Sequence, residues 1–471
     1  DHDSTLTPSG DRGRKDQEPA PFAVVPDAVN RLYVVEAVSR GDYHSGSARC
    51  CRSAAVDPLG RKSVRYPPAW DSAVFELTQI QSALEDLNVD AWLLYDFRGS
   101  NILARRVLEI PDDQMGSRRF FYCIPRSGEP RKLVHRIESG ALDHLPGERT
   151  IYLRWQELEA GVARLTEGHT TIAMEYSPRN ANPYISRVDA GTIELVKSGG
   201  AEVVPSGDLI QHFEATWDSQ QWLMHQAAAV HTNAAFDVAW KFIADGVRAD
   251  GFVEEVAVRD AIMEHFHTNS MTTYHPPIVA VGSHSGDPHY ETGTGENTKI
   301  HEGDFVLVDL WAKLDRPRAV YSDLTRVGFV GTEVPDEYTR IFDIVAAARD
   351  AAIACVRDAY AEDRPLQGWE VDDACRKVID DAGYGEYYVH RTGHSIGQEV
   401  HGNGANMDNL ETREERLVMK NTCFSVEPGI YQPEFGVRSE VDVFVDGEGT
   451  IHVTGGDLQT RVVAVLAEHR S

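Results

Sequence analysis

Acidic residues stand inside otherwise apolar segments in the second half of the sequence. Asp309 lies in FVLVDLW, Asp323 in AVYSDLTRVGF and Glu440 in GVRSEVD. A buried carboxylate is costly unless it is paired, protonated or bound to a metal ion. A salt bridge or a strand-end position would explain either aspartate by itself, so these residues predict a site only together with further partners.

Two other segments supply such partners. His394 lies in HRTGHSIGQ, where the glycines let the backbone approach closely, and His401 follows seven residues later. Glu427 ends the apolar run CFSVE before a Pro-Gly turn. Oxygen ligands together with one imidazole suit Mn²⁺, Co²⁺ or Zn²⁺. Four carboxylates exceed the charge of one divalent ion, so two ions ~3.5–4 Å apart, sharing bridging carboxylates, would balance them better.

The order and context of these segments resemble the pita-bread dinuclear metallopeptidase family, in the branch of the Xaa-Pro aminopeptidases and Xaa-Pro dipeptidases. The resemblance rests on VDLWAK with SDLTR, HRTGHSIGQEVHG, SVEPGIY and GVRSEVD. It covers about residues 75–467, strongly over 275–445 and weakly before that range. It implies a metal-dependent peptidase that hydrolyses the Xaa-Pro bond, at the N-terminus of peptides or in dipeptides.

The resemblance also implies a role for each site residue. The implied metal ligands are two aspartates, one histidine and two glutamates: Asp309, Asp323, His394, Glu427 and Glu440. Asp323 and Glu440 would bridge both ions, and Glu427 would also transfer a proton. The other implied catalytic residues are His289, His390, His401 and Arg438. His289 would lie on the substrate side, His401 beside the scissile peptide, and Arg438 would fix the geometry of the bridging carboxylates.

The implied cofactors are two divalent metal ions, Mn²⁺ in the first place, with Co²⁺ or Zn²⁺ as alternatives. A hydroxide shared by the two ions would be the nucleophile, since metal ions lower the pKa of bound water from ~15.7 towards ~7. The expected partner is a proline-containing peptide. A homodimer is expected from the resemblance alone.

One feature departs from the family pattern. The two aspartates usually stand closer together, whereas here they are 14 residues apart. The additional residues fall in the segment LDRPR at 314–318, whose proline and charged residues predict a longer, exposed hairpin turn. The two carboxylates can therefore still face each other.

Three alternatives stay open beside the peptidase. A non-catalytic binding module on the same fold, or creatinase, would normally have lost ligands that this chain retains. Methionine aminopeptidase normally lacks a preceding α/β domain. The sequence does not separate a dipeptidase from an aminopeptidase.

The expected fold is an α/β N-terminal domain, creatinase-like, followed by an α+β pita-bread catalytic domain. The predicted divisions are a mobile extension over residues 1–70, the N-terminal domain over 71–215 and the metallopeptidase domain over 216–471. Apolar periodicity predicts four helices in the metallopeptidase domain. The two segments with the clearest strand pattern are predicted to form a hairpin. The helices are expected at 219–243, 253–266, 336–360 and 371–381, the hairpin strands at 305–311 and 319–330, and later strands at 423–426, 437–445 and 462–466. His225, on the first of these helices, is expected to be solvated or to cap it, and His275, before two prolines, is expected to be structural.

The amino-acid composition limits the classes of binding partner and the cellular locations that can be expected. The formal net charge is −28, which disfavours nucleic acid and anionic membrane surfaces as partners. The six cysteines are scattered without a C-x-x-C pair, which predicts a reducing compartment, and the cytoplasm is the expected location. No apolar run is long enough to span a membrane, and no signal peptide is visible at the start of the sequence.

Overall fold

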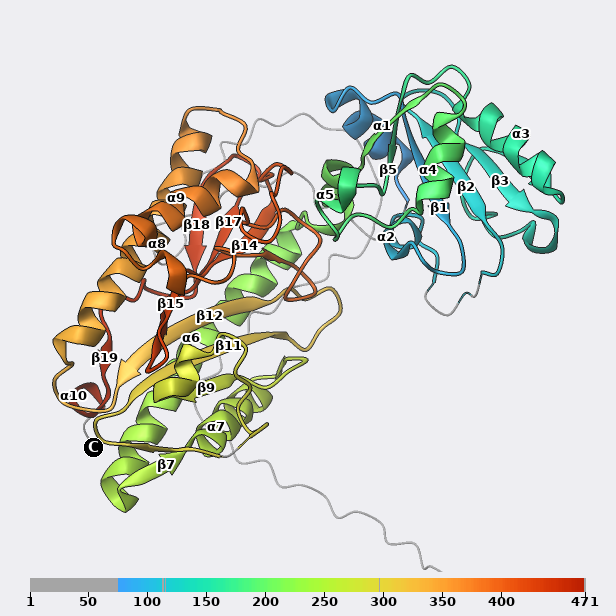
Figure 1. Ribbon diagram of the computed structural model, residues 1–471. Helices are drawn as coiled ribbons and strands as arrows, with labels where there is room; N and C mark the ends of the chain where they lie inside the picture. The colour runs from blue at the N-terminus through green and yellow to red at the C-terminus, as the bar shows by residue number, and fades with distance from the viewer. Residues whose placement is uncertain (1–74, 112–113, 115, 296, 470–471) are drawn as a thin grey trace, which may run out of the picture. The chain divides into compact units, whose positions relative to one another are not determined.

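Figure 1 shows the computed structural model, which describes residues 75–111, 114, 116–295 and 297–469. The extension predicted over residues 1–70 lies outside these residues, and so do residues 71–74 of the predicted N-terminal domain. Among the described residues, no helix is both long and apolar enough to cross a bilayer.

The first part of the described chain is an α/β unit built on one six-stranded sheet, with strand order β4-β3-β2-β1-β5-β6. Its strands are β1 (Ala91–Asp96), β2 (Phe120–Pro125), β3 (Arg131–His135), β4 (Glu148–Tyr152), β5 (Thr171–Met174) and β6 (Glu202–Pro205). Its helices are α1 (Leu77–Asp86), α2 (Ile102–Val107), α3 (Trp155–Thr166), α4 (Ala190–Lys197) and α5 (Gly207–Glu214). Successive residues of β1 belong to two different hydrophobic clusters. Trp92 and Leu94 pack in one cluster, and Leu93 and Tyr95 pack in the other. The sheet is therefore buried on both faces, which explains the uninterrupted apolar run of β1.

The helices of the second part follow the apolar periodicity. They are α6 (Ser219–Asp250), α7 (Glu255–Thr268), α8 (Asp336–Ala361), α9 (Gly368–Asp381) and the short α10 (Val465–Glu468). Helix α6 begins at a capping box formed by Asp218 and Gln221 and ends at Gly251, which adopts a left-handed conformation. It runs seven residues beyond the predicted end at 243, because Ala244 and Val247 continue its buried stripe.

A hairpin of two long strands forms the centre of this second part. Strand β11 (Phe305–Leu314) pairs with β12 (Ser322–Phe329) on one side and with β9 (Ile278–Val281) on the other. In this register Asp309 lies opposite Thr325, and Trp311 lies opposite Asp323. Residues 315–318 of the connection are exposed, so the longer exposed turn that the sequence predicts is confirmed.

The remaining strands are short. They are β7 (Phe252–Glu254), β8 (Met271–Thr272), β10 (Lys299–His301), β13 (Ser395–Ile396), β14 (Thr422–Val426), β15 (Gly429–Tyr431), β16 (Gly436–Arg438), β17 (Val441–Val445), β18 (Ile451–Thr454) and β19 (Val463–Ala464). Strands β13, β14, β17 and β18 form one sheet, and β15 and β16 form a separate hairpin. The single strand predicted over 437–445 is therefore two strands, interrupted at Ser439 and Glu440. The strand predicted over 462–466 is also shorter, because the chain turns into α10 at Val465.

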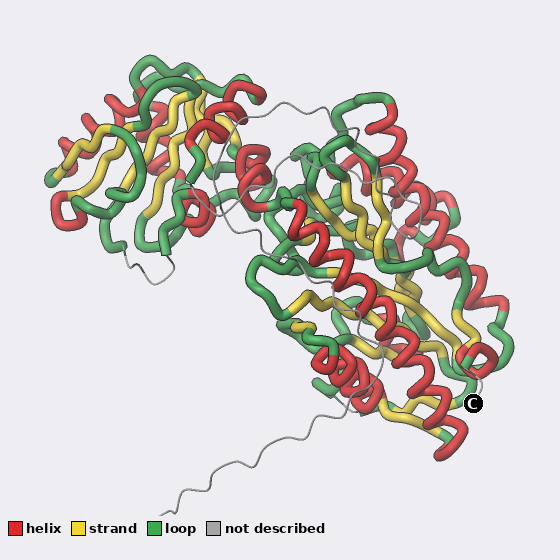
Figure 2. Tube along the Cα trace, turned by 180° about the vertical axis from the view of Figure 1, so that it is seen from behind, coloured by secondary structure: helices red, strands yellow, loops and turns green. Residues whose placement is uncertain are grey.

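The two faces of the central hairpin have different neighbours. Helix α6 packs along β11 and β12. In Figure 2, which views the molecule from the side opposite to Figure 1, this long helix lies across the strands. Val306, Val308 and Leu310 face the cluster that contains α6, whereas Phe305 and Leu307 face the cluster that contains α8. Because side chains alternate along a strand, Asp309 continues the face of Phe305 and Leu307. The carboxylates of the hairpin thus lie on the side away from α6.

Candidate metal centre

The first two carboxylates come from the hairpin, one from each strand. Asp309 lies on β11 and Asp323 on β12, diagonally across the register. Thr325 Oγ1 lies 2.9 Å from Asp309 Oδ1 and 2.7 Å from Glu440 Oε2. A hydroxyl carries one proton and cannot donate to both oxygens at once. The close approach of these carboxylates therefore requires an additional proton or a cation.

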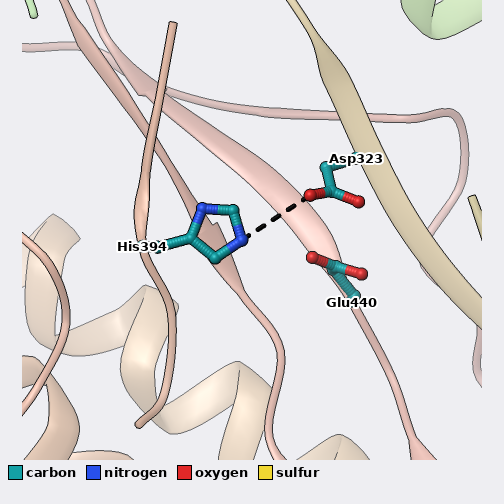
Figure 3. A group of neighbouring side chains, drawn as sticks. All are labelled: Asp323, His394 and Glu440. Carbon is teal, nitrogen blue, oxygen red and sulfur yellow. Dashed lines mark ion pairs between the residues drawn. The ribbon is translucent and has the colours of Figure 1, made fainter. Parts of the chain in front are cut away.

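His394 approaches the same carboxylates from the loop before β13. Its Nε2 lies 3.3 Å from Glu427 Oε1 and 3.6 Å from Asp323 Oδ2. One ligand atom each of Asp323, His394 and Glu440 lies within 4.8 Å of the others, and Figure 3 shows the three side chains converging. The Nδ1 of His394 is 3.3 Å from the Ser395 carbonyl oxygen, so Nδ1–H donates there and leaves the Nε2 lone pair directed at the carboxylates.

A close backbone approach makes this placement of His394 feasible. At Gly393, a Cβ atom would lie 1.9 Å from the Ser425 carbonyl oxygen, so no other residue fits there without a shift. The Ser425 hydroxyl accepts from the His394 amide at 3.0 Å and donates to Glu427 Oε1 at 2.9 Å. The glycine noted in the sequence thus brings the histidine loop onto β14.

Arg438 is the cation that touches this carboxylate cluster. Its Nη2 donates to Asp309 Oδ2, and its Nε donates to Thr325 Oγ1 at 3.0 Å. Arg438 is buried, and the neighbouring Asp309 carboxylate helps to hold its pKa well above the ordinary value against the opposing effect of burial. One guanidinium cannot neutralise four carboxylates, so the described residues alone leave the cluster short of positive charge.

The titration behaviour of the cluster follows from this shortage. Burial raises the pKa of Asp323 and of Glu440 well above the usual range, and the facing carboxylates raise it further. Burial likewise raises the pKa of Asp309, against the lowering effect of Arg438. Burial lowers the pKa of His394 to about 3, so its imidazole is neutral at neutral pH. Buried carboxylates beside a neutral imidazole are the donor set of a divalent-cation site, and these residues fit such ions.

A chain of hydrogen bonds leads from Arg438 to His390. Arg438 Nη1 donates to the Tyr431 hydroxyl at 3.2 Å, and that hydroxyl lies 2.8 Å from His390 Nε2. His390 Nδ1 lies 2.7 Å from the Arg391 carbonyl oxygen, to which it donates. The Tyr431 hydroxyl must then donate to His390 Nε2. Burial lowers the pKa of His390, in agreement with a neutral ring held at both nitrogens.

All nine residues that the sequence predicts for the site line one cavity of about 660 Å³. His401 stacks edge-on against His394, with ring centroids 4.2 Å apart. The neighbouring His394 and burial lower the pKa of His401 to about 3, so this ring is also neutral. His289 is exposed at the cavity wall, and its amide donates to Asp287 Oδ1 at 2.9 Å.

Two buried residues lie behind Asp323. Asp442 accepts from the Asp323 amide at 3.2 Å and from the Ser322 hydroxyl at 3.0 Å. His225 Nε2 lies 3.8 Å from Asp442 Oδ2, and its Nδ1 donates to the Tyr321 carbonyl oxygen at 2.8 Å. His225 is fully buried, so the prediction of a solvated or capping residue is wrong. Its place on the inner face of α6 gives it backbone and hydroxyl partners instead of water.

Sequence reasoning missed several residues that line the cavity or support its side chains. Thr325 follows Asp323 by two positions, so strand alternation alone could have placed it on the same face. Tyr431 stands in the same segment as Glu427, four residues on. Trp311 and His275 form part of the cavity wall, with ring centroids 6.0 Å apart. His275 lines the cavity, a position that no local pattern indicated.

Comparison with known proteins agrees with this geometry. A profile of metallopeptidase family M24 matches residues 223–447. This segment is an M24 metallopeptidase domain. The matched range includes the five predicted metal ligands and also the other predicted catalytic residues, which are His289, His390, His401 and Arg438. The family resemblance predicted from the sequence is therefore confirmed.

Individual relatives of the M24 domain are peptidases by name. The chain is 28% identical over 284 residues to the putative dipeptidase YkvY of Bacillus subtilis, covering 59% of this chain and 72% of that protein. It is 30% identical over 234 residues to the Xaa-Pro dipeptidase of Lactobacillus delbrueckii subsp. lactis, covering 50% of this chain and 58% of that enzyme. The crystal structure of dipeptidase PepE from Mycobacterium ulcerans superposes with a TM-score of 0.57 at 22% identity, over 82% of this chain and 96% of that one. This last likeness shows a shared fold that extends beyond the M24 domain.

Proposed function

We propose that this protein is a metal-dependent peptidase that hydrolyses the peptide bond before proline, at the N-terminus of short peptides or in dipeptides. The observation that carries the proposal is that one cavity is lined by all five predicted ligands, Asp309, Asp323, His394, Glu427 and Glu440. The M24 match and the Xaa-Pro dipeptidase among the relatives support the same activity.

Two divalent ions held by these five residues would activate a water molecule and polarise the scissile carbonyl. Glu427 is placed to accept the proton of that water and pass it to the leaving nitrogen, because its Oε1 faces the cluster and is held by the Ser425 hydroxyl. His401, a neutral ring beside His394, can donate an N–H to the developing oxyanion. Arg438 and Thr325 keep the carboxylates in place.

The cavity wall suits a ring in the substrate. The bond before proline has no N–H, so an enzyme must recognise the pyrrolidine ring by shape. Tyr274, His275 and Trp311 form an aromatic wall beside the carboxylates, with the Tyr274 and Trp311 rings 6.2 Å apart. Flat apolar faces of this kind support ring packing without requiring a backbone donor.

A substrate and metal panel tests the proposal. The protein, freed of metal with a chelator, is assayed with Mn²⁺, Co²⁺ and Zn²⁺ in turn on Xaa-Pro dipeptides, Xaa-Pro tripeptides and matched Xaa-Ala peptides. We expect metal-dependent hydrolysis of the Xaa-Pro peptides above the Xaa-Ala controls. A protein that binds the ions but hydrolyses none of these peptides would be the non-catalytic binding module instead.

Several more detailed predictions from the sequence form part of this proposal. Retention of all five ligand positions supports a peptidase over the binding module and over creatinase. The panel separates a dipeptidase from an aminopeptidase, and it identifies the preferred ion, for which Mn²⁺ remains our prediction. The homodimer, the cytoplasmic location, the creatinase-like character of the N-terminal part and the domain boundary at residues 215 and 216 are likewise predictions.

A further inference from the structure

A buried carboxylate outside the metal cluster is bonded to the segment that carries His289. Glu255, the first residue of α7, is fully buried. Among the described residues its only ion-pair partner is His284, and no arginine or lysine contacts it. A carboxylate in the first turn of a helix is stabilised by the helix dipole, which helps to keep it buried here. Its side-chain partners are Val281, His284 and Tyr290, of which Tyr290 lines the cavity.

The hydrogen bonds of Glu255 span the whole segment from β9 to His289. The Val281 amide, at the end of β9, donates to Glu255 Oε1 at 2.8 Å. His284 Nδ1 lies 3.0 Å from the same oxygen, in the middle of the segment. The Tyr290 hydroxyl donates to Glu255 Oε2 at 2.6 Å, one residue after His289. One carboxylate thus holds the start, the middle and the end of this segment.

The two ring partners of Glu255 also hold each other. The His284 and Tyr290 rings stack with centroids 4.2 Å apart. Burial, together with the Glu255 carboxylate, raises the pKa of the Tyr290 phenol, which therefore stays protonated and donates. Glu255 consequently fixes the chain on both sides of His289, through His284 before it and Tyr290 after it.

The opposite side of the segment is bonded to the β15–β16 hairpin. Ser285 Oγ accepts from the Gly436 amide at 2.9 Å. A Cβ atom at Gly436 would lie 2.0 Å from the Ser285 carbonyl oxygen, so the two backbones are in direct contact. The same hairpin carries Arg438. The segment therefore connects Glu255 on one side with the support of the metal cluster on the other.

We propose that Glu255 is a positioning residue, which fixes residues 282–290 and so holds the imidazole of His289 in place at the cavity wall. The inference rests on the proposed peptidase function for its catalytic consequence, but the fixing of the segment does not depend on that function. Glu255 itself does not line the cavity. Its effect on a substrate therefore acts through the residues of this segment that line the cavity, and the proposal assigns it to His289.

The catalytic test is a double-mutant cycle. Glu255→Gln retains the size of the side chain but removes its charge and one acceptor oxygen. Because small misplacements of a positioned group can cost up to ~10²-fold in rate, we expect kcat/KM on an Xaa-Pro substrate to fall by about 10–100-fold. We expect Glu255→Gln to cause at most about a threefold further loss when His289 is already alanine, since it acts through that residue. If the loss of kcat/KM in the double mutant equals the product of the two single-mutant losses, Glu255 acts independently of His289 and the proposal is overturned.

A milder variant and a control guard against misfolding. Tyr290→Phe removes only the hydroxyl that bonds Glu255 and should show the same coupling to His289 with a smaller loss. Tyr360→Phe is the matched control, because its hydroxyl donates to the Val418 carbonyl oxygen at 2.7 Å outside the cavity. This control should leave kcat/KM unchanged. An equal loss from Tyr360→Phe would contradict the proposal.

Hydrogen exchange separates this inference from the proposed function. In Glu255→Gln we expect amides of residues 281–290 to exchange at least about tenfold faster, while those of α8 keep their protection. Unchanged exchange over 281–290 overturns the positioning role whether or not the protein hydrolyses peptides. Faster exchange in a protein without peptidase activity upholds the fixing of the segment and rejects only the proposed function.

Discussion

Thr325 Oγ1 lies 2.9 Å from Asp309 Oδ1 across the β11–β12 hairpin, and 2.7 Å from Glu440 Oε2. The hydroxyl also accepts from Arg438 Nε at 3.0 Å. One neutral side chain therefore joins two carboxylates from different strands and the arginine that offsets their charge. The orientation of the predicted ligands depends on a residue that binds no metal in the proposed mechanism.

Replacing Thr325 by valine should weaken metal binding while leaving every ligand in place. Valine retains the shape of threonine but lacks the hydroxyl that orients Asp309 and Glu440. Loss of such a supporting hydrogen bond typically costs about 10–100-fold in metal affinity. Calorimetric titration of the metal-free protein with Mn²⁺ measures the change.

A threonine elsewhere controls for the loss of a buried hydroxyl. Thr166 donates to the Val162 carbonyl oxygen at 3.2 Å within α3. Thr166→Val should leave the Mn²⁺ affinity unchanged. Equal affinities of Thr325→Val and the unmodified protein would show that the hydroxyl does not support the site.

Arg438 should stabilise the metal-free protein more than the metal-bound protein. It is buried against the carboxylates, and breaking a buried ion pair from one side costs about 3–5 kcal/mol. In Arg438→Met we therefore expect a large fall in melting temperature in the presence of a chelator. We expect a smaller fall with Mn²⁺ present, because metal ions would then neutralise the same carboxylates. Scanning calorimetry under both conditions measures the two shifts.

Arg349→Met provides the matched comparison. Arg349 is also buried, but its Nη1 donates to the Ser439 hydroxyl at 2.7 Å and to the Gln459 carbonyl oxygen at 2.9 Å. Its ion pair is with the exposed Asp350. Its removal should lower the melting temperature by the same amount with and without metal. The hypothesis about Arg438 fails if its two shifts are also equal.

Local patterns in the sequence predicted the elements that carry the site. The nearly uninterrupted apolar run FVLVDLW follows from a strand with two buried faces, and the charged turn at 314–318 follows from exposure. The positions of Asp309, Asp323 and Glu440 were recognisable because carboxylates are rare in such strands. Long amphipathic helices were predicted to within a few residues, except where α6 continued beyond 243.

Tertiary contacts explain what the sequence could not predict. His225 has an ordinary helical neighbourhood in the sequence, and only the packing of α6 against β12 places it behind Asp442. Glu255 looks like a common acidic residue at a helix start, yet its three donors come from residues 281–290. The short helix α10 replaced an expected strand because an apolar run of five residues does not distinguish the two.

The metal-free protein should become less stable as the pH rises above about 6.5. The pKa values of Asp323 and Glu440 are raised in the folded state, so the folded protein binds more protons than the unfolded chain and loses stability as those protons dissociate. The lowered pKa values of His394 and His401 act in the opposite direction, but only between about 3 and the ordinary value of 6.5. Above that value these two histidines no longer oppose the effect of the carboxylates.

Melting curves between pH 6.5 and 8 measure this effect. We expect the melting temperature to fall with pH in the presence of a chelator and to stay nearly constant with Mn²⁺ bound. The metal-bound protein is the control, since cations hold the same carboxylates ionised. Parallel curves for the two forms would contradict the assignment of the carboxylates to a metal site.

Asp323 and Asp442 offer the sharpest comparison between a ligand and its support. Both are buried aspartates, but Asp323 lines the cavity, whereas Asp442 lies behind it and accepts from the Asp323 amide. Asp323→Asn should reduce the bound metal from about two ions per chain to one or none, because a bridging carboxylate contacts both ions. Asp442→Asn should retain both ions, with affinity reduced by about 10-fold, within the range for an outer partner. Elemental analysis after gel filtration decides between the two roles, and retention of both ions by Asp323→Asn would remove it from the ligand set.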